Sequence, residues 1–316
     1  MPIPPPGPVS PVLSIGAVHW DSLARARRPI TPDTSTPSDI IQAPGGVATN
    51  VARALVRLGV PTTLCGVVGD DMPGRSVGEQ LGREGLSLRL LERKGEVTGQ
   101  YLALHDPDGA LVAACVDDSI LGEASPEIFR ATLALLATEM PASALWFADA
   151  NLPPDILNAV ADEGPQGRLA ADAVSVAKAG RLDGIMNRLR LLFANRAEAA
   201  ALADRTVTSP LKEIAARLHD RGVAEVVLTD GTGPVLASDR AAVREYVPQP
   251  AAVRDVTGAG DALIAGTLAA LARGYGLFDA VPVGLAAARL TIQSAGAVAP
   301  DLSWQRLSHK PDPDRT

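Results

Sequence analysis

Aromatic residues are scarce in this sequence: phenylalanine, tryptophan and tyrosine together make up 3% of its 316 residues. A core with so few large rings must be built mainly from alanine, leucine and valine. With an apolar fraction of 47%, the chain is long enough for one large globular α/β domain or two small ones.

Cysteine is almost as rare, because Cys65 and Cys115, each within an apolar run, are its two examples. So low a number excludes a disulfide-rich secreted scaffold. We expect both thiols to be buried in the core, and we expect the protein to reside in a reducing cytoplasm. No apolar stretch reaches the length of a membrane span without interruption, so we expect no membrane partner.

A strongly basic run is absent too, and the net charge is −7. Nucleic acids require surfaces rich in lysine and arginine, so the sequence argues against a nucleic-acid ligand. Backbone amides at a helix N-terminus still allow an acidic protein to bind phosphate groups.

The sequence between its two ends has the rhythm of an α/β protein. We expect a disordered, proline-rich tail at residues 1–11, a domain at 12–305 and a flexible tail at 306–316. The predicted strands are 12–18, 62–68, 145–148, 169–173, 189–194 and 226–229, and the predicted helices are 48–58, 74–84, 153–162, 177–182, 197–202 and 261–273. Such alternation predicts a mostly parallel sheet with helices on both faces and ligands beyond the carboxyl ends of the strands.

Two segments, 22–43 and 95–118, interrupt this rhythm. The second contains two predicted strands, 98–105 and 110–116, joined by Asp106-Pro107-Asp108-Gly109, which is typical of a hairpin turn. A hairpin inside an alternating pattern must lie outside the main sheet. It is either an excursion without function or a small β lid over a binding site.

The segment from Asp255 to Asp261 places Gly258, Ala259 and Gly260 between two carboxylates, directly before an apolar helical run. The small residues let the backbone approach a ligand, and the start of the helix favours an anion. A carboxylate at an anion site suggests a base that accepts a proton from an attacking hydroxyl. The alternative is a tight turn into a helix with an aspartate that caps it.

A second motif comes early in the chain. Gly45 and Gly46 precede a helix whose first turn contains Asn50, and Asp21 closes the first predicted strand. Paired glycines allow close approach to a polar ligand, and a carboxylate accepts from neighbouring hydroxyls. Otherwise, Asn50 is a polar surface residue and Asp21 a turn residue.

Two weaker motifs follow later strands. Asn195 and Glu198 open a helix, and Thr229 and Gly231 lie at a strand end that runs into a glycine-rich turn. The acid also fits the positive end of a helix without any ligand, and the second segment also fits an ordinary turn.

In this order, and over residues 12–303, the four motifs resemble those of the ribokinase-like (PfkB) sugar and nucleoside kinases. The resemblance implies a three-layer α/β/α sandwich with a small β-sheet lid, ATP and Mg²⁺ as cofactors, K⁺ as a further cation, and a homodimer formed through the lid. The residues that it implies are Asp261 with the backbone of Gly258, Ala259 and Gly260 for catalysis; Asp21, Gly45, Gly46 and Asn50 for the substrate; Asn195, Thr229, Gly231 and Thr257 for ATP; and Glu198 and Asp255 for the metal.

Within that family the stretch with Asp172, Ser175 and Lys178 is similar to one in pseudouridine kinases, as is the region 290–303. Lys178 either steadies a phosphate or is a solvated helix residue. Asp149 and Asn151, at a strand end, either reach the substrate or cap the strand.

Three functional hypotheses result. The first is a kinase that converts pseudouridine or a similar nucleoside to its 5′-phosphate. The second is a kinase of a free sugar or sugar acid, such as ribose, fructose or 2-keto-3-deoxygluconate. The third is a catalytically silent sensor on the same fold, which would not need to keep Asp261.

Overall fold

The computed structural model describes residues 8–308, so residues 1–7 and 309–316 of the two predicted tails lie outside the described residues. The described part of each tail is held by the body. Ser10 N donates to Ala272 O at 2.9 Å, and Pro11 O accepts from Leu145 N at 3.0 Å. At the other end, α11 (Trp304–Ser308) continues three residues past the predicted end of the domain.

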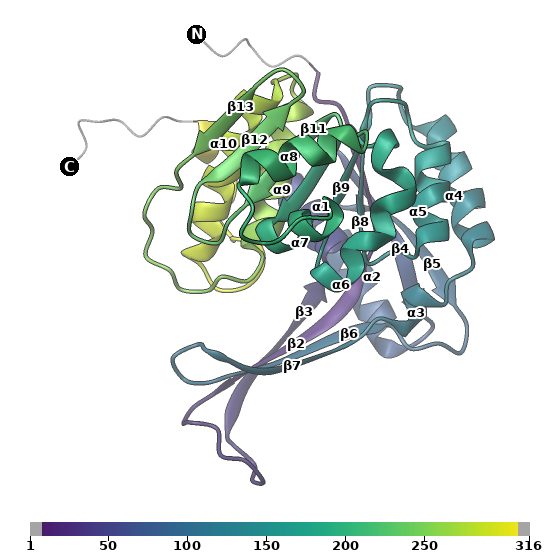
Figure 1. Ribbon diagram of the computed structural model, residues 1–316. Helices are drawn as coiled ribbons and strands as arrows, with labels where there is room; N and C mark the ends of the chain where they lie inside the picture. The colour runs from purple at the N-terminus through teal and green to yellow at the C-terminus, as the bar shows by residue number, and fades with distance from the viewer. Residues whose placement is uncertain (1–7, 309–316) are drawn as a thin grey trace.

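Within residues 8–308, nine strands form one central sheet in the order β13-β12-β11-β10-β9-β8-β1-β4-β5 (Figure 1). The seven strands from β11 to β5 are parallel, and β12 and β13 are antiparallel additions at one edge. The strands are β1 (Val12–Ile15), β4 (Thr62–Gly69), β5 (Ser87–Arg93), β8 (Leu145–Asp149), β9 (Leu169–Asp172), β10 (Leu191–Asn195), β11 (Glu225–Thr229), β12 (Val235–Asp239) and β13 (Val243–Tyr246).

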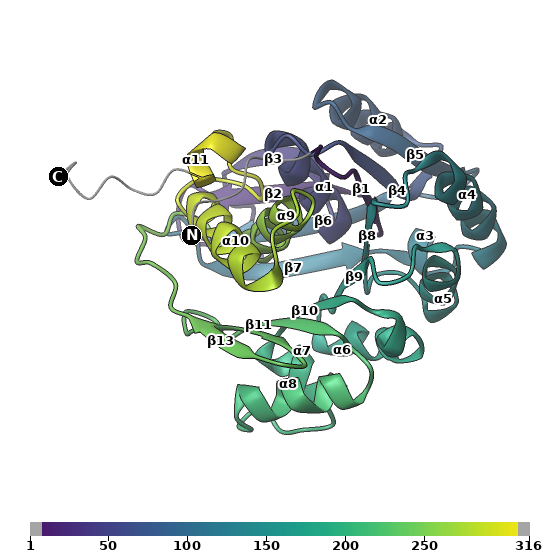
Figure 2. The same ribbon diagram turned by 90° about the horizontal axis from the view of Figure 1, so that it is seen from above.

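Helices cover both faces of this sheet, which confirms the predicted three layers (Figure 2). Side chains alternate between the faces, so Val12 packs on one side and Leu13 on the other. The first face carries α1 (Val47–Arg57), α2 (Met72–Arg83), α9 (Ala259–Leu271) and α10 (Leu277–Ile292). The second carries α3 (Ser119–Gly122), α4 (Pro126–Glu139), α5 (Pro154–Glu163), α6 (Val176–Ala179), the 3₁₀ helix η1 (Gly180–Arg188), α7 (Arg196–Leu202) and α8 (Leu211–Asp220).

Helix α9 is deeply buried, because all of its residues from 262 to 271 are buried. It can pack tightly because Gly266 lies against α10, where a methyl group at Gly266 would come within 2.8 Å of the Gly284 Cα atom. A helix that is apolar all round must lie inside a protein. Its N-terminus is thereby fixed firmly to the body.

A second sheet of four strands, in the order β3-β2-β6-β7, extends from the body as the predicted lid (Figure 1). Its strands are β2 (His19–Ala26), β3 (Ser38–Gly45), β6 (Gly99–His105) and β7 (Leu111–Asp117). The predicted first strand was too long, because the chain leaves the main sheet after Ile15 and enters the lid at His19. Asp21 therefore lies inside a lid strand, paired with Tyr101 and Ala43, and not in a turn that closes β1.

The expectation that both cysteines are buried is wrong for Cys115. Cys65 is buried as expected, but Cys115 is exposed on β7. Every residue of β7 is exposed, because this strand is the outer edge of a sheet that has no helix layer. Apolar sequence thus did not imply burial here.

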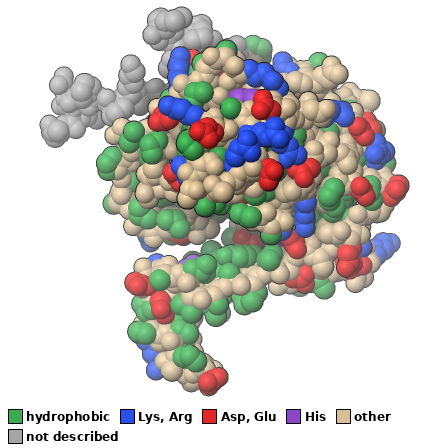
Figure 3. All heavy atoms as spheres, viewed as in Figure 1, with side chains coloured by type: hydrophobic (Ala, Val, Ile, Leu, Met, Phe, Trp, Pro, Cys, Tyr) green, Lys and Arg blue, Asp and Glu red, His purple; other side chains and the backbone are tan. Residues whose placement is uncertain are grey.

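A hollow separates the lid from the body (Figure 3). Asp21 and Tyr101 are register partners in β2 and β6, so their side chains lie on the same face of the lid. Within residues 8–308, no helix combines the length and the apolarity that crossing a bilayer requires.

Candidate active site

The turn before α9 has the geometry that the glycine pattern predicts. Gly258 caps the helix with φ of 75°, a left-handed conformation, and a methyl group there would lie 2.2 Å from Ala297 O. The first turn of a helix has N–H groups without intrahelical acceptors. Of the three expected amide donors, Ala259 N already donates to Val256 O at 3.3 Å.

Asp261 lies in this first turn and contacts the early motif. Asn50 Nδ2 donates to Asp261 Oδ2 at 2.9 Å, which joins α1 to α9 across 211 residues of sequence. Burial raises the pKa of Asp261 from 3.8 to about 7; the hydrogen bond from Asn50 opposes this, and the charge of Asp149 adds to it. A carboxyl group with a pKa near neutrality suits a general base.

The raised pKa predicts how activity depends on pH. Only the ionised form of Asp261 accepts a proton, so kcat/KM is expected to rise as the pH increases through about 7. Initial rates between about pH 5.5 and 9 will measure this acid limb. A profile that is flat over that range would contradict the role of base.

Gly258 offers a test of the turn itself. Gly258→Ala forces a left-handed φ on a side chain that also meets backbone, so it is expected to lower the free energy of unfolding by about 1–3 kcal/mol. Gly260→Ala is the matched control, because it is helical and a methyl group there meets nothing within 4 Å. Thermal or denaturant unfolding will compare the two; equal stabilities would refute the strain.

The acceptor side of the site is formed where the lid joins the body. Gly45 lies against Asp21 so closely that a methyl group on Gly45 would be 1.8 Å from Asp21 Oδ2. Burial and, to a lesser extent, the charge of Asp261 raise the pKa of Asp21 to about 7, against the opposing charge of Arg53. Asp261 on the body is therefore near enough for its charge to raise the pKa of Asp21 on the lid.

Two acceptor atoms at this junction lack donors. Asp21 Oδ1 and Asn50 Oδ1 are buried, and neither has a hydrogen-bond partner within the described chain. An unsatisfied buried polar group is costly and needs an explanation. The predicted substrate residues Asp21, Gly45 and Asn50 are thus brought together beside Asp261, while Gly46 takes φ of 95° directly before α1.

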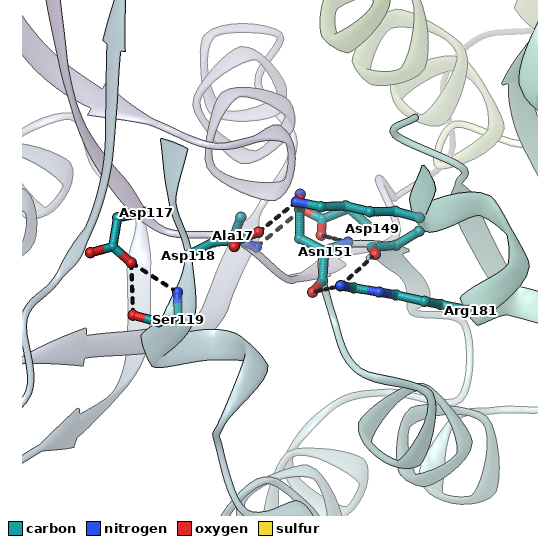
Figure 4. A network of polar contacts seen from close by, with 9 residues as sticks. Ala17, Asp117, Asp118, Ser119, Asp149, Asn151 and Arg181 are labelled. Carbon is teal, nitrogen blue, oxygen red and sulfur yellow. Dashed lines mark hydrogen bonds and ion pairs between the residues drawn. The ribbon is translucent and has the colours of Figure 1, made fainter. Parts of the chain in front are cut away.

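Asp149 is a hub beneath this junction (Figure 4). Its carboxylate accepts from Ala17 N at 3.1 Å, from Ala48 N at 2.8 Å and from Asn151 N at 3.0 Å. Gly16 leaves room for it, since a methyl group there would be 2.4 Å from the carboxylate. The structure therefore favours capping over substrate contact for Asp149.

Lys178 connects the base of the lid to the body. Its Nζ donates to Asp118 Oδ2 at 2.5 Å and to Asn151 Oδ1 at 2.7 Å. Asp118 follows the last lid strand, and Asn151 follows β8. Figure 4 labels both residues. Lys178 is therefore bonded to two acceptors and is not a freely solvated residue.

The nucleotide motifs border a cavity of about 240 Å³ next to Asp261. Asn195 caps α7, and its backbone N and side-chain Nδ2 donate to Glu198 at 2.8 and 2.6 Å. Asn195, Glu198, Thr229 and Gly260 line the cavity together with Asp261. The predicted residues Gly231 and Thr257 are not among its lining residues.

Asp172 lines the same cavity, although the sequence pointed to it only as part of a subfamily stretch. Burial raises its pKa well above the ordinary value, and the charges of Glu198, Asp261 and Asp149 raise it further. Its signal in the sequence was its place at the carboxyl end of a buried strand. The cavity is thus lined by three carboxyl groups, those of Asp172, Glu198 and Asp261, and the charges of the last two disfavour ionisation of Asp172. Within residues 8–308, no three His, Cys, Asp or Glu side chains are grouped closely enough to hold a metal ion by themselves.

Asp255, predicted as a metal ligand, is engaged by the backbone. Thr257 N donates to one carboxylate oxygen at 2.9 Å, and Gly296 N to the other at 3.1 Å. Burial by itself would raise the pKa of Asp255, but these hydrogen bonds outweigh burial and lower the pKa. Asp255 ties the turn to the 296 loop and is not among the residues that line the cavity.

Comparison with known proteins identifies the family. The profile of the pfkB family carbohydrate kinases matches residues 10–304. Pseudouridine kinase of Escherichia coli (strain K12) is 28% identical over 296 residues, which cover 92% of this chain and 93% of that protein.

Two solved structures agree. A carbohydrate kinase from Agrobacterium tumefaciens has a TM-score of 0.81 at 31% identity, with 94% of this chain and 95% of that one covered. Ribokinase from Thermotoga maritima has the same TM-score at 18% identity, with 95% and 98% covered, and so confirms the ribokinase-like fold. This chain is a phosphotransferase that acts on a hydroxyl group of a sugar or nucleoside, and it belongs to the pfkB family of carbohydrate kinases.

Proposed function

We propose that this kinase transfers the γ-phosphoryl group of ATP to the 5′-hydroxymethyl group of pseudouridine or a similar nucleoside. The observation that carries the proposal is the pairing of Asp21 with Tyr101 on one face of the lid. A carboxylate suits the vicinal hydroxyls of ribose, and a neighbouring aromatic ring suits a planar base. The similarity to pseudouridine kinase over nearly the whole chain supports the same substrate.

The two buried oxygens without donors fit this substrate. The ribose hydroxyls would donate to Asp21 Oδ1 and Asn50 Oδ1 and so satisfy atoms that the chain itself leaves unpaired. Because Gly45 has no side chain, there is space beside it for the carboxylate of Asp21.

In the reaction, Asp261 removes the proton as the 5′-oxygen attacks the γ-phosphorus. The new bond forms between that oxygen and phosphorus, the bond from phosphorus to the β,γ-bridging oxygen breaks, and ADP leaves. Backbone N–H groups of Gly258 and Gly260 stabilise charge on the transferred group. Closure of the lid excludes water that would otherwise hydrolyse ATP.

ATP would lie along the cavity lined by Asn195 and Thr229, with its γ-phosphate at the start of α9. Gly231 and Thr257 would contact the nucleotide from outside that lining. Asp172 and Glu198 fit a hydrated Mg²⁺, because this ion prefers carboxylate oxygens and keeps several waters. When bound, Mg²⁺ would neutralise charge on the phosphates. Asp255 acts by holding the turn, and K⁺ at the 255–257 loop stays a prediction.

An ATP-consumption screen will test the function. The acceptors are pseudouridine, uridine, adenosine, ribose, fructose and 2-keto-3-deoxygluconate. We expect the highest kcat/KM with pseudouridine. Turnover of free sugars alone would reject the nucleoside and leave a sugar kinase, and no turnover with any acceptor would favour a sensor.

The exposed apolar side chains of the lid suggest a homodimer. Ile40, Leu102 and Leu111 are 68%, 47% and 55% exposed, and the β7 edge offers unpaired backbone groups. Covering such an edge removes a liability of open sheets. Light scattering coupled to gel filtration is expected to show twice the chain mass, and Leu102→Lys with Leu111→Lys to restore the monomer. A monomeric wild-type chain would refute the dimer.

A further inference from the structure

We propose that Arg53 is a positioning residue that sets the acceptor site by fixing the end of β3, at Pro44 and Gly45, against Asp21. The inference rests on the proposed role of Asp21 in holding the hydroxyls of the acceptor. Arg53 is not among the residues that line the cavity, and its effect is carried by the backbone at the end of β3 and by its charge.

Arg53 joins three segments from the middle of α1. Its Nε and Nη2 donate to the two carboxylate oxygens of Glu84, each at 2.8 Å, and its Nη1 donates to Pro44 O at 3.0 Å. The side chains of Arg53 and Glu84 are only 10% and 21% exposed. A two-pronged pair of this kind fixes the plane of the guanidinium, so the third donor has a defined direction.

That third donor reaches the end of β3, which contacts the acceptor site. Pro44 pairs with Trp20 in the lid, and the next residue, Gly45, pairs with His19. The space between Gly45 and the Asp21 carboxylate is too small for a methyl group. A movement of Pro44 would shift Gly45, its neighbour in the chain, and Gly45 lies directly against the Asp21 carboxylate.

The charge of Arg53 acts on the same group. Asp21 is faced by Asp261 from α9, by Arg53 from α1 and by Tyr101 from β6. Burial and Asp261 raise the pKa of Asp21 to about 7, and Arg53 opposes both. Without this cation, more of Asp21 would be protonated at neutral pH and unable to accept from two hydroxyls.

These two effects can be separated by different substitutions. Arg53→Met removes the bonds and the charge, whereas Glu84→Gln weakens the clamp but keeps the charge. Arg53→Lys keeps the charge but cannot bond two partners in the fork geometry. Arg190→Met is the matched control, since Arg190 and Glu225 form a comparably shielded pair, at 27% and 19% exposed, where β10 and β11 begin.

The experiment measures kcat and the KM of each substrate, with pseudouridine and ATP or, should only free sugars react, with the sugar that reacts best. We expect Arg53→Met to raise the KM of the acceptor about 10²-fold, as misplacement of a binding group does, with the KM of ATP within about twofold. The midpoint of the acid limb of kcat/KM should move to higher pH in Arg53→Met. Glu84→Gln and Arg53→Lys should raise the acceptor KM without moving that midpoint.

An Arg53→Met variant with wild-type acceptor KM and an unmoved acid limb would overturn the proposal. So would Arg190→Met with the same kinetic changes, because a general loss of packing would then explain them. If Arg53→Met does not fold, normal acceptor KM values in both Arg53→Lys and Glu84→Gln would overturn it. Asp21→Asn separates the two inferences: a normal acceptor KM there removes the acceptor site itself, whereas a large effect there with a normal Arg53→Met removes only the role of Arg53.

Discussion

Replacing Asp261 with asparagine is expected to lower kcat by about 10²–10⁴, the range for a lost general base, while ATP still binds. Asparagine keeps the shape and accepts from Asn50, which now donates to Asp261 at 2.9 Å, but it takes no proton. Single-turnover rates and the Kd of ATP will measure the two effects separately. Near-normal turnover would remove the catalytic role of Asp261.

Stability provides the control for this variant. Because the folded pKa of Asp261 is raised, its ionised form disfavours folding, and this cost grows as the pH rises from about 4 to about 7. Asp261→Asn should therefore be at least as stable as the wild type at pH 8, so a fall in kcat will not reflect unfolding. Asp279→Asn, in the first turn of α10, is the matched substitution outside the site and should leave kcat unchanged.

Replacing Asp21 with alanine is expected to lower kcat/KM for the acceptor by about 10²–10³, mainly through KM. The variant removes a carboxylate that would accept from two hydroxyls; a hydrogen bond to a charged group contributes about 1.5–3 kcal/mol, and the lower end of that range for both bonds gives the effect expected here. The KM of ATP should stay within about twofold, because Asp21 lies on the lid and not among the residues that line the cavity.

Ser22→Ala is the matched control for Asp21→Ala. Ser22 follows Asp21 in β2, and its side chain points to the opposite face, where its Oγ accepts from Gln42 Nε2 at 3.1 Å. It should leave both KM values near those of the wild type. An equal rise in the KM of acceptor and of ATP in Asp21→Ala would place Asp21 elsewhere in the mechanism.

Much of the fold follows from local pattern. Buried strands such as β8 and β11 are continuous apolar runs, because both of their faces are covered by helices. The edge strands β5 and β13 were not predicted, since a strand with partly exposed faces, such as Ser87–Arg93, alternates with polar residues and has no such run. The hairpin of the lid was predicted from two strand-like segments and the turn residues that join them.

The site was predicted where one short motif contains both the backbone shape and the reactive group, as in the turn from Gly258 to Asp261. It was not predicted where the contacts join distant segments. Asp149 holds backbone from residues 17 and 48, and Arg53 bonds Glu84 31 residues away. Nothing local in the sequence marks such partners, because the fold alone brings them together.

One consequence concerns engineering of acceptor preference. Asp149 has its hydrogen bonds distributed among three separate stretches of backbone, and Gly16 has no space for a larger residue beside it. Substitution of Asp149 or Gly16 would therefore loosen both the end of β1 and the start of α1. Side chains of β2 and β6 that face the hollow do not hold separate backbone segments together in this way. Mutant libraries aimed at new alcohols should therefore vary the lid and leave Asp149 and Gly16 unchanged.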